Sequence, residues 1–178
     1  ITFDVKGTLK RDTVRRALNV DIAYALHAPS LETVFNMIPE SVLKRESMEA
    51  RGSVKMEGDV KGWYGKQQMP AVTLKVQIDK ASAKYDKLPY GIDNFTADFY
   101  AFVDLMRKQP SYADLKIFHF QGAHTDILAD AKIVNLLEDP DITFNTKSKV
   151  DLTALAQAFP LQEGVTIGGD LEADLRLK

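Results

Sequence analysis

The sequence predicts a mainly β protein: an antiparallel, curled or groove-like sheet of roughly ten strands with two short amphipathic helices. Three observations lead to this prediction. Apolar and polar residues alternate along most of the chain, most regularly in residues 17–27 and 72–78. Short segments containing glycine, proline or aspartate separate the alternating runs, which favours antiparallel pairing. Helical spacing of apolar residues occurs in two short segments, 31–38 and 152–159.

The alternating runs give the expected strands in chain order. Residues 1–10 and 17–27 flank a charged connection and predict a hairpin. Strand pattern resumes in residues 52–63, where Gly58 interrupts the alternation and indicates a bulge. The stretch from Ala81 to Val103 predicts a strand, a turn at Leu88-Pro89-Tyr90-Gly91 and a second strand. The remaining strands are expected at 72–78, 115–121, 124–136, 142–150 and 165–177.

The two predicted helices resemble each other. Ser30 is placed to cap the first helix and Pro39 to end it. Leu31 aligns with Leu152 and Pro39 with Pro160 at one constant offset, and a glycine and a strand follow each helix after a polar gap. The chain is therefore predicted to be a single fragment, residues 1–178, of a repetitive β-domain with a unit of about 120 residues. Helices 31–38 and 152–159 are equivalent in this prediction, although two unrelated capped helices would give the same pattern.

Composition limits the classes of function. The 178 residues carry a net charge of −2 and contain no cysteine. No basic stripe is present to neutralise nucleic-acid phosphates, and thiol catalysis, disulfides and cysteine-bound metals are excluded. No apolar run reaches the ~18 residues needed to span a membrane. The chain begins at Ile1 inside an alternating run, which predicts that it was excised from a longer protein.

Few residues suggest chemistry. His119, His124 and Asp126 match no standard zinc spacing, and ordinary surface histidines are the favoured interpretation. Asp93 and Asp98 are the nearest candidates for a catalytic carboxylate pair, but exposed strand carboxylates are the preferred interpretation. There is no glycine-rich phosphate loop, no nucleophile elbow and no H-E-x-x-H motif. The sequence therefore predicts a protein that is not an enzyme and uses no metal or cofactor.

Aromatic and large apolar residues concentrate in and after the central stretch. The candidates for an apolar groove are Tyr85, Leu88, Phe95, Phe99, Phe118 and Phe120. For each residue alone, the core of a β-domain is the favoured interpretation. As a set they exceed what two short helices can cover, so the apolar face must be covered by the sheet itself, by a partner or by lipid.

Two stretches resemble the AsmA family of bacterial envelope proteins, including the AsmA-like proteins of Bacteroidetes. The first has the pattern Tyr85-x-x-Leu88-Pro89-x-x-Ile92-x-Asn94-Phe95 after a strand of small residues. The second runs from Ser148 to Leu155 and continues through Phe159-Pro160-Leu161, Gly164 and Gly168-Gly169-Asp170-Leu171. The resemblance covers most of the chain from Gly52 onward. The motifs are short and degenerate, and they contain no catalytic residue.

The resemblance implies a periplasmic segment whose parent protein is anchored in the inner membrane by an N-terminal helix, which this chain lacks. It implies a repetitive sheet with an apolar groove that handles lipids or assists outer-membrane assembly. The implied partners are phospholipid acyl chains, outer-membrane assembly proteins and neighbouring repeats of the same chain, with no nucleic acid.

Two other functions compete with this one. The first is a β-sandwich binding module of a cell-envelope protein that recognises carbohydrate or protein through Trp63, Tyr64 and Tyr90. The second is a hydrolase whose site forms only in three dimensions. A sealed core would favour the sandwich, an open apolar face would favour the lipid-handling module, and clustered carboxylates or histidines would favour the hydrolase.

Overall fold

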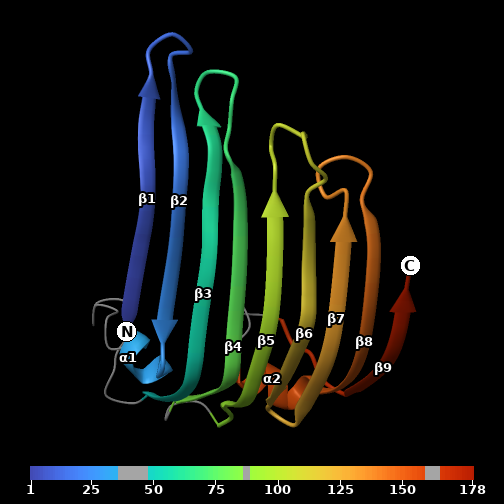
Figure 1. Ribbon diagram of the computed structural model, residues 1–178. Helices are drawn as coiled ribbons and strands as arrows, with labels where there is room; N and C mark the ends of the chain where they lie inside the picture. The colour runs from blue at the N-terminus through green and yellow to red at the C-terminus, as the bar shows by residue number, and fades with distance from the viewer. Residues whose placement is uncertain (36–47, 86–88, 159–164) are drawn as a thin grey trace.

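A computed structural model describes residues 1–35, 48–85, 89–158 and 165–178 (Figure 1). Nine strands form one sheet in the order β1 to β9, and every neighbouring pair is antiparallel. The elements are β1 (Thr2–Asp12), β2 (Ala17–Ala28), α1 (Leu31–Phe35), β3 (Met48–Tyr64), β4 (Ala71–Tyr85), β5 (Ile92–Val103), β6 (Tyr112–Gly122), β7 (Thr125–Val134), β8 (Asp141–Asp151), α2 (Leu152–Ala158) and β9 (Asp170–Leu177). The predicted fold class is confirmed.

The sheet is open, because β1 pairs only with β2 and β9 only with β8 among the described strands. Figure 1 shows the strands side by side, with β1 and β9 at opposite edges and β9 tilted strongly away from β1. This tilt is the accumulated twist expected of a long antiparallel sheet. The described strands form one layer and not the two layers of a sandwich.

The sheet has nine strands, whereas about ten were predicted, because two of the predicted strands form one continuous strand. Residues 72–78 and 81–85 both belong to β4, which continues through a bulge at Lys80 (φ 46°). Opposite this bulge, β3 has Gly52 with a φ of 103°. The register of β3 and β4 shifts between Arg51 and Ser53.

The prediction of a bulge at Gly58 is wrong. Gly58 pairs in regular register with Tyr24 on one side and Leu74 on the other. A side chain at this position would collide with the Tyr24 ring and the Thr73 carbonyl, so glycine is needed for close packing.

The last strand is shorter than predicted. It begins at Asp170, and Val165 and Ile167 precede it outside regular structure. The preceding residue, Gly169, has a φ of 104°, a backbone conformation that favours glycine.

Both helices lie at the same end of the sheet (Figure 1). Helix α2 begins directly after β8, where a carboxylate oxygen of Asp151 accepts the backbone N–H of Ala154 at 2.9 Å and caps the first turn. Ala154 and Ala158 pack on Ala123 in the turn between β6 and β7. Helix α1 lies against β3, and residues 36–38 of the predicted helix fall outside the described residues, as does Phe159 of the second.

The two helices occupy comparable positions in the meander. Helix α1 joins the adjacent strands β2 and β3, and α2 joins β8 and β9. The equivalence of the two helices and the repeat of about 120 residues remain predictions.

Candidate functional site

The register assigns each strand residue to one of two faces, because paired residues of neighbouring strands point the same way. On one face, here called the apolar face, the series runs through Leu26, Met56, Val76, Phe99, Leu115, Ala131, Phe144 and Leu177 across eight strands, with Phe3 opposite Leu26 on β1. Arg11, at the end of β1, is the single charged residue at the described strand positions of this face.

The apolar face is not sealed. None of the large side chains among the described residues is fully buried, and the buried hydrophobic residues are alanines and two valines, Val20 and Val150. Towards the edges of the sheet the exposure is high, at 63% for Phe3 on β1 and 49% for Leu175 on β9. In a closed domain of this size, large apolar side chains of the central strands are expected to be the most buried.

Four of the six predicted groove residues meet on this face. Phe95 pairs with Phe120, and Phe99 pairs with Leu115. The rings of Phe95 and Phe118 make an edge-to-face contact with centroids 5.5 Å apart. All four phenylalanines are half-buried. The side chain of Tyr85, the last residue of β4, and the whole of Leu88 lie outside the described residues.

Alanines, which are not among the groove residues predicted from the sequence, separate the phenylalanine rings. Phe118 lies between Ala97 on β5 and Ala129 on β7. Small neighbours leave room for a ring to lie against the sheet, so the aromatic and alanine positions together shape this surface. In the sequence, alanine recurs at alternate positions of the segments that form β5 and β7. Only the register shows that Ala97 and Ala129 flank Phe118.

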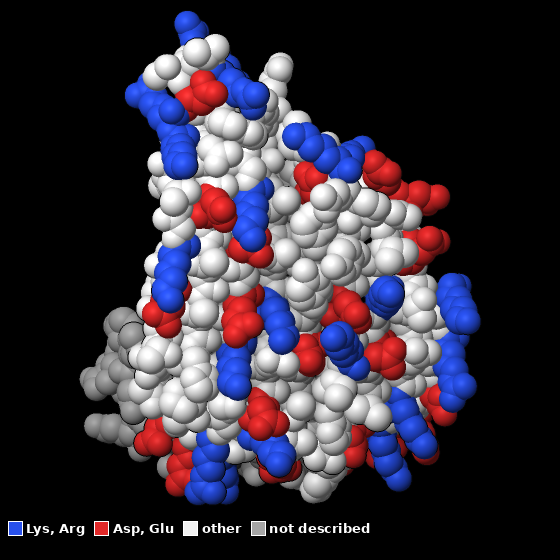
Figure 2. All heavy atoms as spheres, viewed as in Figure 1, with Lys and Arg blue, Asp and Glu red and all other residues white. Residues whose placement is uncertain are grey.

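The opposite face, here called the polar face, is charged and faces the viewer in Figure 2. Lysines and carboxylates alternate over it, and several register pairs combine opposite charges: Asp21 with Lys61, Glu57 with Lys75, Asp114 with Lys132, Asp126 with Lys149 and Lys147 with Asp174. Cross-strand pairs of opposite charge favour one register over its neighbours. The polar face therefore specifies the alignment of the strands, while the described strand positions of the apolar face carry a single charge, Arg11 at the end of β1.

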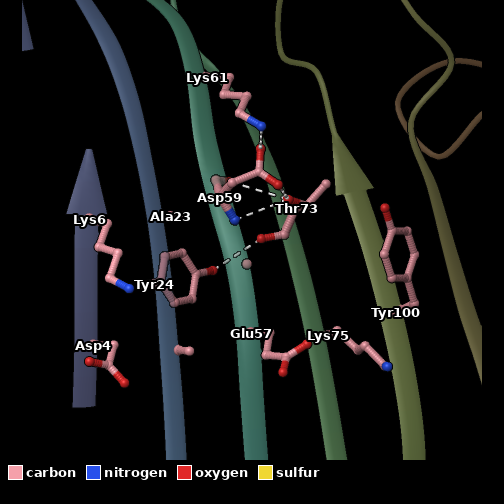
Figure 3. A pocket seen from close by; sticks show the side chains of 12 residues that line it. Asp4, Lys6, Ala23, Tyr24, Glu57, Asp59, Lys61, Thr73, Lys75 and Tyr100 are labelled. Carbon is pink, nitrogen blue, oxygen red and sulfur yellow. Dashed lines mark hydrogen bonds and ion pairs between the residues drawn. The ribbon is translucent and has the colours of Figure 1, made fainter. Parts of the chain in front are cut away.

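A hollow of about 530 Å³ lies on the polar face across β1 to β5 (Figure 3). Its lining includes three carboxylates and three lysines: Asp4, Glu57, Asp59, Lys6, Lys61 and Lys75. The lysine Nζ of Lys61 lies 3.6 Å from a carboxylate oxygen of Asp59. Because acidic and basic groups balance, the hollow offers no preference for a ligand of one charge.

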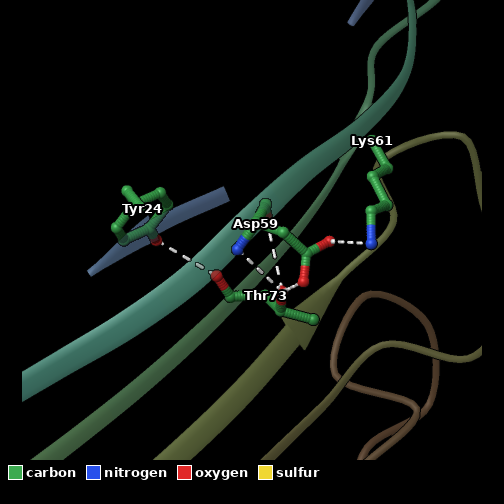
Figure 4. Close-up of polar contacts among 4 residues, drawn as sticks. All are labelled: Tyr24, Asp59, Lys61 and Thr73. Carbon is green, nitrogen blue, oxygen red and sulfur yellow. Dashed lines mark hydrogen bonds and ion pairs between the residues drawn. The ribbon is translucent and has the colours of Figure 1, made fainter. Parts of the chain in front are cut away.

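Thr73 connects three strands at this hollow (Figure 4). Its hydroxyl accepts the backbone N–H of Asp59 at 3.0 Å and donates to the Asp59 carboxylate. Its backbone carbonyl accepts the Tyr24 hydroxyl at 3.1 Å, so this tyrosine on β2 reaches across β3 to β4. These contacts are internal to the sheet, and they give Thr73, Asp59 and the Tyr24 hydroxyl partners without a ligand.

Aromatic residues also occur on the polar face. Tyr100 and Tyr112 stack with ring centroids 5.6 Å apart, and Phe102 lies 5.9 Å from Tyr112. Hydrogen bonding to Tyr112 raises the pKa of the Tyr100 hydroxyl, and burial adds to the effect.

The three aromatic residues proposed as a binding platform do not come together. Trp63 is on the polar face, where the Arg15 guanidinium lies 4.8 Å from its ring centroid. Tyr64 follows it in the same strand and points to the opposite face. Tyr90 precedes β5 and contacts His124 in an edge-to-face arrangement at 5.0 Å.

The histidines separate into two pairs. His119 lies 3.0 Å from Asp126 on the polar face, and His124 lies 3.4 Å from Asp151 at the start of α2. The pKa of Asp151 is lowered, first by the backbone N–H of Ala154 and then by His124. The described residues include no group of three or more metal-ligating side chains.

The two candidate catalytic carboxylates do not form a pair. Asp98 accepts a hydrogen bond from Gln77 at 3.2 Å on the polar face. Asp93 occupies a register irregularity at the start of the same strand. They lie five positions apart along β5, about 16 Å at the rise of an extended strand, which exceeds the separation that glycoside hydrolysis requires.

Comparisons with protein-family models, curated proteins and solved structures gave no match to this chain. Within the described part of the chain, no helix has the length and apolar character needed to cross a bilayer. The candidate site therefore rests on the geometry of the sheet, and the open apolar face is its strongest feature.

Proposed function

We propose that this chain is a non-enzymatic, AsmA-like module of the bacterial cell envelope that holds lipid acyl chains against the apolar face of its sheet. It would act in the periplasm, in lipid handling or outer-membrane assembly, within a parent protein anchored in the inner membrane. The observation that carries the proposal is a broad apolar face whose large side chains remain partly exposed.

The dimensions of this face suit acyl chains. Nine strands at a spacing of about 4.8 Å give a surface about 38 Å wide. Covering a methylene group completely stabilises it by about 0.8 kcal/mol, and an open surface that covers one side supplies roughly half of that. Several chains lying side by side would therefore bind through area alone, with weak discrimination between lipids.

The absence of charge from the described strand interior of this face supports the same proposal. A charged group facing hydrocarbon carries a desolvation cost, and the single charge at these positions, Arg11, lies at the end of an edge strand. Headgroups would remain at the rim of the sheet in contact with water. No group on the apolar face needs to titrate or react for this function.

Two leucines of equal exposure on opposite faces provide the test. Leu175 on β9 belongs to the apolar face and is 49% exposed, whereas Leu128 on β7 belongs to the polar face and is 50% exposed. The chain is incubated with vesicles that contain a fluorescent phospholipid, reisolated, and analysed for bound lipid by extraction and mass spectrometry. We expect lipid on the wild type and on Leu128→Asp, and a severalfold loss on Leu175→Asp.

Equal lipid loading of both variants would refute a role for the apolar face. A wild-type chain that takes up no lipid would refute the proposal as a whole. Because both leucines are half exposed, neither substitution buries a charge, and similar melting temperatures for the two variants would exclude unfolding as the cause.

A carbohydrate- or protein-binding module remains the second candidate. The stacked Tyr100 and Tyr112 beside the hollow on the polar face are the observation that favours it. If that face were the binding surface, Leu175→Asp would leave recognition unchanged, and Tyr100→Ala would abolish it. A glycan array probed with the wild type and Tyr100→Ala distinguishes this candidate from lipid handling.

A further inference from the structure

A second hollow lies where the β1–β2 turn meets the end of β3, at the end of the sheet opposite the helices (Figure 1). Its volume is about 430 Å³. Arg11 and Arg16 line it beside the exposed side chains of Leu18 and Tyr64, and none of the described residues in its lining is acidic. Its floor is made of small residues, because a side chain at Gly65 would come within 3.2 Å of the buried Ala17 methyl group.

The charge of this hollow differs from that of the hollow on the polar face, where acidic and basic groups balance. Residues 10–18 contain four basic residues and one acidic residue, Asp12. The Asp12 carboxylate accepts the backbone N–H groups of Val14 and Arg15, both at 2.9 Å, so it serves the turn. Figure 2 shows lysine and arginine side chains gathered over this end of β1 and β2. The surplus of positive charge attracts an anion to the hollow.

The residue type at these two positions narrows the class of anion. Arginine presents a planar fork of N–H donors that can bind two oxygens of one phosphate group. Arg16 has a φ of 50°, a backbone conformation that is uncommon for any residue other than glycine or asparagine. Such conformations occur preferentially where a side chain serves a binding site. Two arginines around one hollow therefore favour a phosphate ester as the ligand.

The hollow continues into the apolar face. Arg11 pairs with Leu18 and Leu18 with Tyr64, so these three residues form one row across β1, β2 and β3. From this row, β2 continues on the same face for eight residues to Leu26, a length of about 26 Å. One leaflet of a bilayer has a hydrocarbon thickness of about 15 Å. An acyl chain that begins at the row therefore fits along the strand on the apolar face.

We propose that Arg11 and Arg16 bind the phosphate of an anionic phospholipid whose acyl chains lie on the apolar face. This inference rests on the proposed lipid binding and adds a headgroup class to it. The phosphate lies in the hollow, and the glycerol esters lie beside Leu18 and Tyr64. A headgroup without a cationic group is preferred, because choline or ethanolamine would face the same positive side chains. The single charge at the described strand positions of the apolar face thereby gains a ligand.

Vesicles that contain equal amounts of phosphatidylglycerol and phosphatidylcholine with identical acyl chains test the proposal. The chain is incubated with them, reisolated and extracted, and mass spectrometry gives the total lipid per chain and the ratio of the two lipids. We expect the wild type to enrich phosphatidylglycerol at least about threefold, the order that exposed charge contacts supply. Arg11→Gln combined with Arg16→Gln should lower the ratio to about one, with less than about a twofold loss of total lipid.

Lys147→Gln combined with Lys149→Gln is the matched control. It removes the same number of positive charges from the polar face of β8, where both side chains are exposed. We expect it to keep the wild-type ratio, and similar melting temperatures for both double variants would exclude unfolding as a cause. Raising the salt concentration from about 0.02 M to about 0.5 M should reduce the enrichment without lowering the total lipid, because salt screens the charges.

The outcomes separate this inference from the proposed function. Lipid on the double arginine variant in the wild-type ratio would overturn the headgroup site and leave the proposed lipid binding intact. An equal fall of the ratio in the lysine control would also overturn it, since general attraction to an anionic membrane would then explain the enrichment. A wild-type chain that carries no lipid would refute both. Displacement of bound phosphatidylglycerol by an equal concentration of glycerol phosphate would indicate a site for free phosphate esters and overturn the lipid assignment.

Discussion

Replacing Phe118 by alanine measures whether the apolar face is open in solution. The ring lies between Ala97 and Ala129 and contacts the ring of Phe95 edge to face. Full burial of a phenylalanine contributes about 1.5–3 kcal/mol, and Phe118 is only partly buried. Loss of the aromatic contact adds about 0.5–1.5 kcal/mol. On an open face no enclosed cavity remains, so the expected loss in free energy of unfolding is about 2 kcal/mol.

The same substitution in a sealed core costs about 3–5 kcal/mol, because the enclosed cavity adds to the lost transfer energy. Urea unfolding followed by circular dichroism, with the fluorescence of Trp63 as a second probe, gives the free energy for both proteins. Ile117→Ala serves as the control, since Ile117 lies on the polar face of the same strand and is 44% exposed. We expect its cost to remain below about 1 kcal/mol. A loss of 4 kcal/mol or more for Phe118→Ala would contradict an open face.

Two further predictions concern the frame that holds this face. Gly58→Ala should lower the stability by at least about 1 kcal/mol, measured as a shift in melting temperature, because the added methyl group collides with the Tyr24 ring and the β4 backbone. Asp151→Ala should lower the melting temperature at neutral pH. Since folding lowers the pKa of this carboxyl, its contribution is complete above the ordinary value of 3.8 and is lost as the pH falls through the lower folded value. The melting temperatures of wild type and Asp151→Ala should therefore converge in acid, and a constant difference across that range would argue against a charged cap.

The strands and their two faces could be predicted from the sequence, because alternation with a period of two depends only on local backbone geometry. Phe95 and Phe99 were assigned to one face from their spacing alone, and the register places them there. The helix starting at Leu152 was likewise predicted from its apolar spacing, and the structure shows it.

The bulges could not be predicted. Lys80 has a positive φ, a conformation that is uncommon for a residue other than glycine, and nothing in its neighbours indicates it. The strand continues through the bulge at Lys80, so the two strands predicted on either side of it form the single strand β4. Gly58 carried the expected bulge signal but serves to accommodate Tyr24, a partner that only the register identifies.

Only part of the candidate site could be predicted, again because the pairing of distant strands is not visible in the sequence. Alternation indicated one apolar face, but whether a second layer covers it depends on how strands pair at long range. The balance of charge on the polar face, such as Glu57 opposite Lys75, is also invisible until the register is known. Local patterns therefore predicted the surface, and pairing determined its exposure.

The strict meander from β1 to β9 has a consequence for how the chain is made. Each strand pairs only with the strands before and after it in sequence, so no strand must wait for a distant partner or insert between two earlier ones. A chain emerging from a ribosome or a translocation channel could add each strand to a growing edge as soon as it appears. Folding would then proceed from the N-terminus to the C-terminus. The sequence separation between contacting residues would stay short however many hairpins were added. Such a protein can lengthen or shorten by whole hairpins during evolution without rethreading the strands already in place.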